Sequence, residues 1–179
     1  MKPRGLAAAL AVAAAALAAA PRALARDSFI GPDREGSSAI RLSGGFTDGP
    51  DTALTGFEVS HFLTDTIALA PVLQLGVADD HFLFAPSLDA KIVIDVDSEP
   101  RLLPFAQAGL GFAYVDEDES GTGDADDAGF LVHAGGGVDF FVTERLSLGT
   151  AVYFNFLPGE VQDEDFFFSW HLITFTIWF

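Results

Sequence analysis

The chain has 179 residues, of which 50% are hydrophobic, and it carries 26 acidic residues against nine basic ones, for a formal net charge of −17. This balance argues against binding to nucleic acid, and against docking on an anionic lipid surface by charge. The absence of cysteine excludes a disulfide framework and thiolate metal sites.

The first 25 residues have the features of an export signal. Lys2 and Arg4 precede an Ala/Leu/Val run, and a small-x-small cleavage site follows at residues 23–25. We therefore expect a cleaved signal peptide over residues 1–25. The alternative, a retained anchor helix, is less favoured because the apolar run is short and has no stop-transfer flank. Residues 26–36 contain Gly, Pro and charges without a period, and we expect them to form a short periplasmic leader.

From residue 37 to residue 179, apolar and polar residues alternate with a period of two, which indicates strands. The pattern predicts eight strands, an even number. The connections after the second, fourth and sixth strands are short, whereas those after the other strands hold most of the acidic residues, and the longest are 116–127 and 157–167. The expected strands are residues 37–46, 53–62, 67–77, 82–95, 102–115, 129–142, 146–156 and 168–179.

The last expected strand, residues 168–179, has a continuous apolar face that ends in Phe179. Strict alternation places Ser169 and His171 on this same face, toward lipid, and Trp170 on the other face. Aromatic residues also gather near strand ends, as interface girdles require. These aromatic residues are Phe46, Phe62, Phe82, Phe84, Tyr114, Phe140, Phe141, Phe156, Phe166, Phe167, Phe168 and Trp178.

These patterns predict an all-β protein, an eight-stranded antiparallel transmembrane β-barrel over residues 37–179. After the signal no apolar run is long enough for a spanning helix, so any crossing is by strands. A barrel in lipid also explains why the chain is both apolar and acidic. The alternative is a soluble lipocalin-like barrel or sandwich with its apolar face inward. It is less favoured because the second faces are rich in Gly, Ala and Ser rather than Lys and Glu.

The export signal, the eight alternating strands, the Gly-rich stretches 109–111 and 135–137 and the terminal Phe179 resemble the small OmpA-like outer-membrane barrel superfamily. The resemblance is to members that consist of the barrel alone. It implies a monomer in the outer membrane of a Gram-negative-type cell, in contact with lipid and lipopolysaccharide. It also implies that the barrel-assembly machinery recognises the closing strand, through Phe175, Ile177 and Phe179.

Several polar residues fall on the faces that point into the expected barrel. An eight-stranded barrel is narrow and filled with side chains, and buried charges must pair, so we expect a structural network of ion pairs. Passage of small solutes through rearranged pairs is the alternative that the resemblance implies. The predicted interior polar network comprises Arg41, Glu58, Asp89, Lys91, His133 and Asp139, with Gln74, Gln107, Tyr153 and Asn155.

The acidic connection 116–127 partly matches a twelve-residue calcium loop, which needs hard oxygen ligands around a Gly turn. The match has two departures, because an Asp replaces the Glu at the last position and strands rather than helices flank the loop. A solvated acidic loop without a specific ion is the alternative. The expected ligands are Asp116, Asp118, Ser120, Asp124 and Asp127; no other cofactor is expected.

An enzyme that modifies lipid A by acyl transfer or deacylation is the competing function. Such chemistry needs a Ser nucleophile, a His base and an orienting acid near the outer leaflet. His133 has no Ser two positions away on its strand face, and His171 and Ser169 are expected to face lipid. We therefore expect no enzymatic activity and a structural or surface-interaction role.

Overall fold

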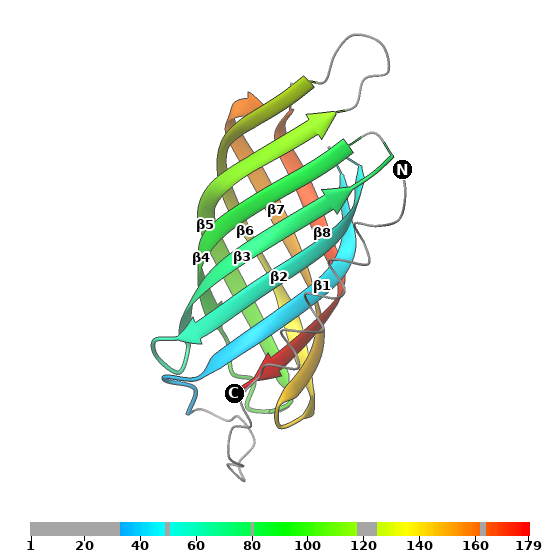
Figure 1. The fold of residues 1–179 in the computed structure, drawn as a ribbon. Helices are drawn as coiled ribbons and strands as arrows, with labels where there is room; N and C mark the ends of the chain where they lie inside the picture. Colours follow the sequence, from blue (N-terminus) through cyan, green and yellow to red (C-terminus); the bar gives the residue numbers. More distant parts are fainter. Residues whose placement is uncertain (1–32, 49–50, 80, 118–124, 162–163) are drawn as a thin grey trace.

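The computed structural model describes residues 33–48, 51–79, 81–117, 125–161 and 164–179. Eight antiparallel strands form one closed barrel in which each strand pairs with its neighbours in sequence, and the first pairs with the last (Figure 1). The expected eight-stranded antiparallel barrel is therefore confirmed. The strands are β1 (Ser38–Asp48), β2 (Thr52–Phe62), β3 (Ile67–Val77), β4 (His81–Val93), β5 (Leu102–Glu117), β6 (Ala125–Thr143), β7 (Leu146–Val161) and β8 (Glu164–Trp178).

The two ends of the barrel differ. The connections β2–β3, β4–β5 and β6–β7 lie together with the carboxyl terminus at the lower end in Figure 1, which we call the turn end. The other four hairpins meet at the opposite end, which we call the loop end. No helix long and apolar enough to cross a bilayer occurs in the described ranges.

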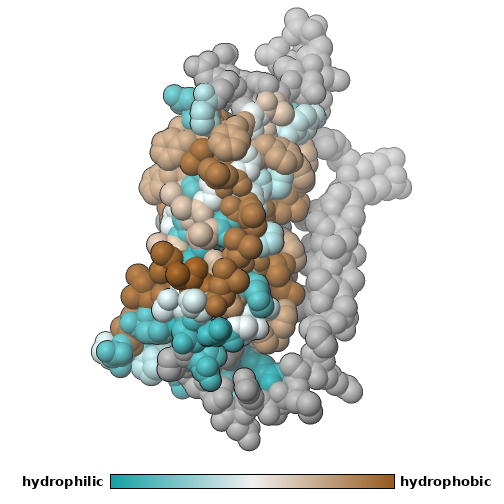
Figure 2. Space-filling model, turned by 90° about the vertical axis from the view of Figure 1, so that its left-hand side faces the viewer, coloured by the Kyte–Doolittle hydropathy of each residue, from teal (hydrophilic) through white to brown (hydrophobic). Residues whose placement is uncertain are grey.

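The outer surface of the barrel is apolar. Large hydrophobic side chains on every strand are exposed, among them Leu110 at 57% and Phe130 at 53%. Figure 2 shows apolar side chains over most of the height of one face, with polar ones gathered at the turn end. Alternation produces this surface, because successive side chains of a strand point to opposite sides of the sheet.

Two hairpins are longer than the sequence pattern predicted. β5 and β6 pair through Glu117 and Ala125, and β7 and β8 continue to Val161 and Glu164. Strand therefore extends into the expected connection 116–127 at residues 116–117 and 125–127, and it covers most of the expected connection 157–167. In the β7–β8 hairpin the contrast between faces is lost because Leu157 and Phe167 point inward and are buried, so both faces carry apolar side chains.

A β-bulge interrupts the alternation in β8. Gly149 pairs with Thr174, but Ala151 pairs with His171, so two residues of β8 oppose one of β7. Leu172 and Ile173 are consequently both exposed. Ser169 and His171 then point into the barrel and are buried, so the expectation that they face lipid is wrong.

Four of the expected girdle aromatics also lie inside the barrel. Phe62, Phe141, Phe167 and Trp178 are each at most 2% exposed. Strand ends carry aromatic residues on both faces, and the position of a residue along a strand does not say whether its side chain points into the barrel or outward. Members of the expected girdle that are exposed near the loop end include Phe46, Phe82, Phe156 and Phe166. Phe154 and Trp170, which were not in that set, are exposed as well, so the expectation that Trp170 lies on the face opposite the lipid-facing one is wrong.

Arg34, just before β1, fastens the chain to two turns at the turn end. Its side chain is 1% exposed; Nε donates to the Asp65 carbonyl at 2.7 Å, and Nη2 donates to both Asp95 carboxylate oxygens at 2.7 and 2.8 Å. The last residues of the expected leader are therefore part of the packed barrel end.

We expect Arg34→Ala to lower the free energy of unfolding by about 1–3 kcal/mol, because hydrogen bonds to charged groups stabilise by that order. Urea unfolding of the folded barrel in lipid vesicles measures the change. Arg101→Ala is the matched control, since Arg101 lies at the same end and is exposed. Equal effects of the two substitutions would contradict the role given to Arg34.

Candidate functional site

A layer of ion pairs crosses the lumen in the half of the barrel nearer the turn end. Arg41 on β1 and Glu58 on β2 are directly opposite each other in the ladder. Arg41 Nη1 lies 3.4 Å from Glu58 Oε2, and Arg41 Nη2 also donates to Asp139 Oδ2 on β6. Lys91 Nζ on β4 donates to Glu58 Oε1 at 2.7 Å. Four strands are thus joined by two bases and two carboxylates, all buried.

Neutral side chains complete this layer. Ser60 Oγ donates to Glu58 Oε1 at 2.6 Å, and Arg41 Nε donates to Thr176 Oγ1 at 3.2 Å. The Phe105 ring lies 4.3 Å from both the Arg41 guanidinium carbon and Lys91 Nζ, so its face contributes to holding the two cations. Buried charges need opposite charges and hydrogen bonds of this kind to be tolerated, and only Asp139 Oδ1 among the oxygens of the two carboxylates has no partner in the described residues.

A second polar cluster centres on Asp89. Its Oδ1 lies 2.7 Å from His133 Nε2 and accepts from Ser87 Oγ at 2.8 Å, while Oδ2 accepts from Gln107 Nε2 at 2.6 Å. β5 separates the strands of Asp89 and His133, and Gly109 lies between the two residues in the ladder. A Cβ at Gly109 would collide with the Asp89 carboxylate, so glycine leaves the room for this contact.

Two further groups extend the polar interior toward β7 and β8. Tyr153 stacks on His133 with ring centroids 5.5 Å apart, and contacts the His171 ring edge-on at 5.1 Å. His171 Nδ1 lies 2.5 Å from Ser43 Oγ. Separately, Asn155 joins Gln74 and Ser169 by hydrogen bonds of 3.3 and 3.0 Å. These polar side chains are all buried inside the barrel.

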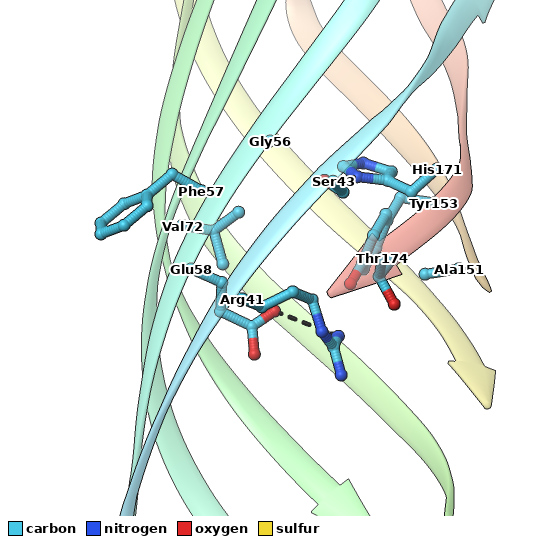
Figure 3. Close-up of a pocket in the computed structure, with 10 residues that line it drawn as sticks. All are labelled: Arg41, Ser43, Gly56, Phe57, Glu58, Val72, Ala151, Tyr153, His171 and Thr174. Carbon is cyan, nitrogen blue, oxygen red and sulfur yellow. Dashed lines mark hydrogen bonds and ion pairs between the residues drawn. The ribbon is translucent and has the colours of Figure 1, made fainter. Parts of the chain in front are cut away.

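A small cavity lies between the ion-pair layer and the Ser43–His171 pair (Figure 3). In Figure 3, Ser43, Tyr153 and His171 lie on one side of it, and Arg41 with Glu58 lies on the other. It has room for about one water molecule. The lining residues are Arg41, Ser43, Gly56, Phe57, Glu58, Val72, Ala151, Tyr153, His171 and Thr174.

Apolar side chains pack inside the barrel on both sides of the polar interior. At the turn end, Trp178 packs against Phe62 and Phe141 with ring centroids 5.6 and 5.3 Å apart, and its indole N–H donates to Ser147 Oγ at 3.1 Å. At the loop end, a second cluster fills the lumen. It consists of Leu83, Ala85, Ala113, Val115, Leu131, Leu157 and Phe167. We call these clusters the turn-end plug and the loop-end plug.

Three Ser–His contacts occur among the residues that the structure describes, and strand spacing did not reveal them. Ser43–His171 and Ser87–His133 are inside the barrel, and Ser38–His61, at 3.0 Å, lies at the outer surface of the turn end. Their members are on different strands, so only the pairing register brings them together. In the Asp89 cluster, the acid and Ser87 both contact the same ring nitrogen, Nε2. A catalytic triad needs them on opposite nitrogens.

All ten residues of the predicted interior network are buried in the barrel. The ion-pair layer contains Arg41, Glu58, Lys91 and Asp139, and the Asp89 cluster contains Asp89 and His133. Among the predicted calcium ligands, Asp118, Ser120 and Asp124 lie outside the described residues. Asp116 and Asp127 are in the paired ends of β5 and β6. No group of three or more acidic or His side chains able to hold a metal occurs in the described part of the chain. The calcium site therefore stays a prediction.

No protein-family model and no curated protein matches the sequence. Solved structures do match. The N-terminal β-barrel domain of Pseudomonas aeruginosa OprF is 18% identical with a TM-score of 0.65, over 81% of this chain and 98% of that chain. Neisserial surface protein A is 12% identical with a TM-score of 0.62, over 79% and 95%. Ail, the attachment invasion locus protein of Yersinia pestis, is 10% identical with a TM-score of 0.57, over 81% and 99%.

Identities this low establish similarity of fold alone, and the similarity extends over nearly the whole length of each of the three barrels. The resemblance that the sequence pattern suggested is confirmed at that level: the chain has the fold of the small, eight-stranded outer-membrane β-barrels.

Proposed function

We propose that this protein is an integral outer-membrane β-barrel with a structural and surface-interaction role, whose lumen is sealed. The observation that carries the proposal is the reversed distribution of polarity, with paired charges inside and an apolar surface outside (Figure 2). In water such a surface would aggregate, whereas in a bilayer it is solvated by acyl chains. A closed barrel also leaves no backbone edge in the lipid.

Its position in the cell follows from the same proposal. Export by the signal peptide of residues 1–25 delivers the chain to the periplasm, and the turn end remains on that side. Phe175 on β8 and Phe179, the residue after β8, are both exposed, so the assembly machinery can reach the closing strand. The loop end then contacts lipopolysaccharide and the surroundings of the cell, and the barrel acts as a monomer.

The two plugs support a sealed lumen rather than the narrow solute passage. An ion entering from either end would meet buried aromatic or aliphatic side chains before it reached the charged layer. Transfer of an unpaired charge into such a cluster costs many kcal/mol. Rearranging the ion pairs alone therefore opens no path.

The lipid A-modifying alternative receives little support from the Ser–His contacts. Two of them are inside the barrel, and in the proposed orientation the exposed Ser38–His61 pair is on the periplasmic side. Lipid A is in the opposite leaflet. A nucleophile must reach its substrate, so none of the three contacts suits that reaction.

Planar-bilayer recording tests the sealed lumen. We expect no unitary current from the wild-type barrel in concentrated potassium chloride. We expect discrete currents from a Trp178→Ala/Phe167→Ala variant, which removes one ring from each plug. The exterior pair Trp170→Ala/Phe166→Ala is the matched control and should remain silent. A stable unitary current in the wild type would contradict the proposal.

A further inference from the structure

The cavity between the ion-pair layer and the Ser43–His171 pair contains two buried polar atoms whose hydrogen bonding is incomplete. His171 Nε2 and Thr174 Oγ1 have no hydrogen-bond partner among the described residues. The two residues are 4% and 1% exposed, and both line the cavity. Burying such groups without a partner is costly, and native proteins satisfy them with protein groups or ordered water.

The backbone is arranged to present these two atoms to the same space. His171 and Thr174 are the residues on either side of the β8 bulge, which turns Leu172 and Ile173 outward. Without the bulge, alternation would place His171 on the lipid side. Thr150 stabilises the bulge from outside, because its hydroxyl donates to the His171 carbonyl at 2.9 Å and accepts from Trp170 Nε1 at 3.2 Å.

Glycine keeps the surroundings of the cavity open. A Cβ at Gly56 would collide with Ser43 Oγ and lie 2.7 Å from His171 Cε1. A Cβ at Gly149 would lie 2.9 Å from Thr174 Oγ1. Larger residues at these positions would push His171 and Thr174 out of place.

We infer that the cavity is a binding site for one water molecule, which joins His171 Nε2 to Thr174 Oγ1 and so bridges the two segments of β8 across its bulge. Water fits by size and because it both donates and accepts, so it suits either tautomer of His171. Ions fit less well. A cation would lie beside Arg41 and an anion beside Glu58, while Arg41 is already paired with Glu58 and Asp139.

The plugs give the bound water a distinctive property. Buried apolar side chains lie between the cavity and each end of the lumen, so we expect exchange with bulk water to require local opening of the barrel. The water is therefore long-lived, and its residence time far exceeds that of a surface water. Water relaxation dispersion measures the number of such long-lived water molecules in the folded barrel.

The test combines crystallography with relaxation dispersion. In crystals grown with bromide, we expect one water within hydrogen-bond distance of both atoms and no anomalous bromide peak there. Thr174→Val keeps the shape but removes one partner, and should lose one long-lived water. The matched control is Thr176→Val, whose hydroxyl is bonded to Arg41 and which should retain the count. An anomalous peak in the cavity, a dry cavity, or an unchanged count in Thr174→Val would overturn the inference.

Discussion

Gly45→Ala should prevent the barrel from closing normally. A Cβ on Gly45 would collide with the carbonyl oxygen of Trp170, and would come within 2.8 Å of its carbonyl carbon. Both atoms belong to the backbone of β8 next to the bulge, where no change of rotamer can relieve the contact. We expect a loss of about 3 kcal/mol or more in unfolding free energy, or failure to fold, at the upper end of overpacking effects. Urea titration in lipid vesicles measures it.

Gly44→Ala is a control one residue away on the same strand. A Cβ on Gly44 would have no heavy atom within 4 Å. Its effect should therefore stay within about 0.5 kcal/mol. Comparable losses from the two substitutions would show that β1 and β8 are not packed together as described.

Arg41→Met should be the most damaging change within the lumen. It leaves Asp139, and one oxygen of Glu58, buried without their cation, and breaking one side of a buried pair typically costs about 3–5 kcal/mol. Lys91 still donates to Glu58 in this variant, so most of the lost stability comes from leaving Asp139 without its cation. Equilibrium unfolding of the refolded variant measures the change.

A second variant separates loss of charge pairing from loss of packing. Arg41→Met/Asp139→Asn removes both the cation and the charge it left unpaired, and should recover a substantial part of the stability. Arg101→Met, at an exposed site, should have almost no effect. If Arg41→Met costs less than about 1 kcal/mol, the ion-pair layer does not organise the interior.

The period of two was sufficient to predict the class of fold and which way most strands face. It worked best where one face is charged or small and the other is apolar, as around Arg41, Glu58 and Lys91. Those positions are buried in the structure, as alternation implies. The set of polar residues in the lumen could be predicted from the sequence, because a narrow barrel places every inward-facing residue in the same interior.

The contacts themselves were not visible. Asp89 meets His133, and Ser43 meets His171, through pairing between strands distant in sequence. The bulge in β8 was also missed, because Leu172 and Ile173 are both apolar and mark no break in the pattern. Trp178 was assigned to the exterior girdle because an inward aromatic at a strand end looks the same in sequence as an outward one.

The most direct test of the central claim is the electrophoretic mobility of the mature chain, residues 26–179, folded in lipid and run with and without boiling. A closed and stable barrel predicts a faster-migrating band in the unboiled sample, which shifts to the unfolded position on heating. The unboiled band should also require lipid or detergent to form. A chain that is freely soluble without detergent and shows no heat-dependent shift would contradict a membrane barrel.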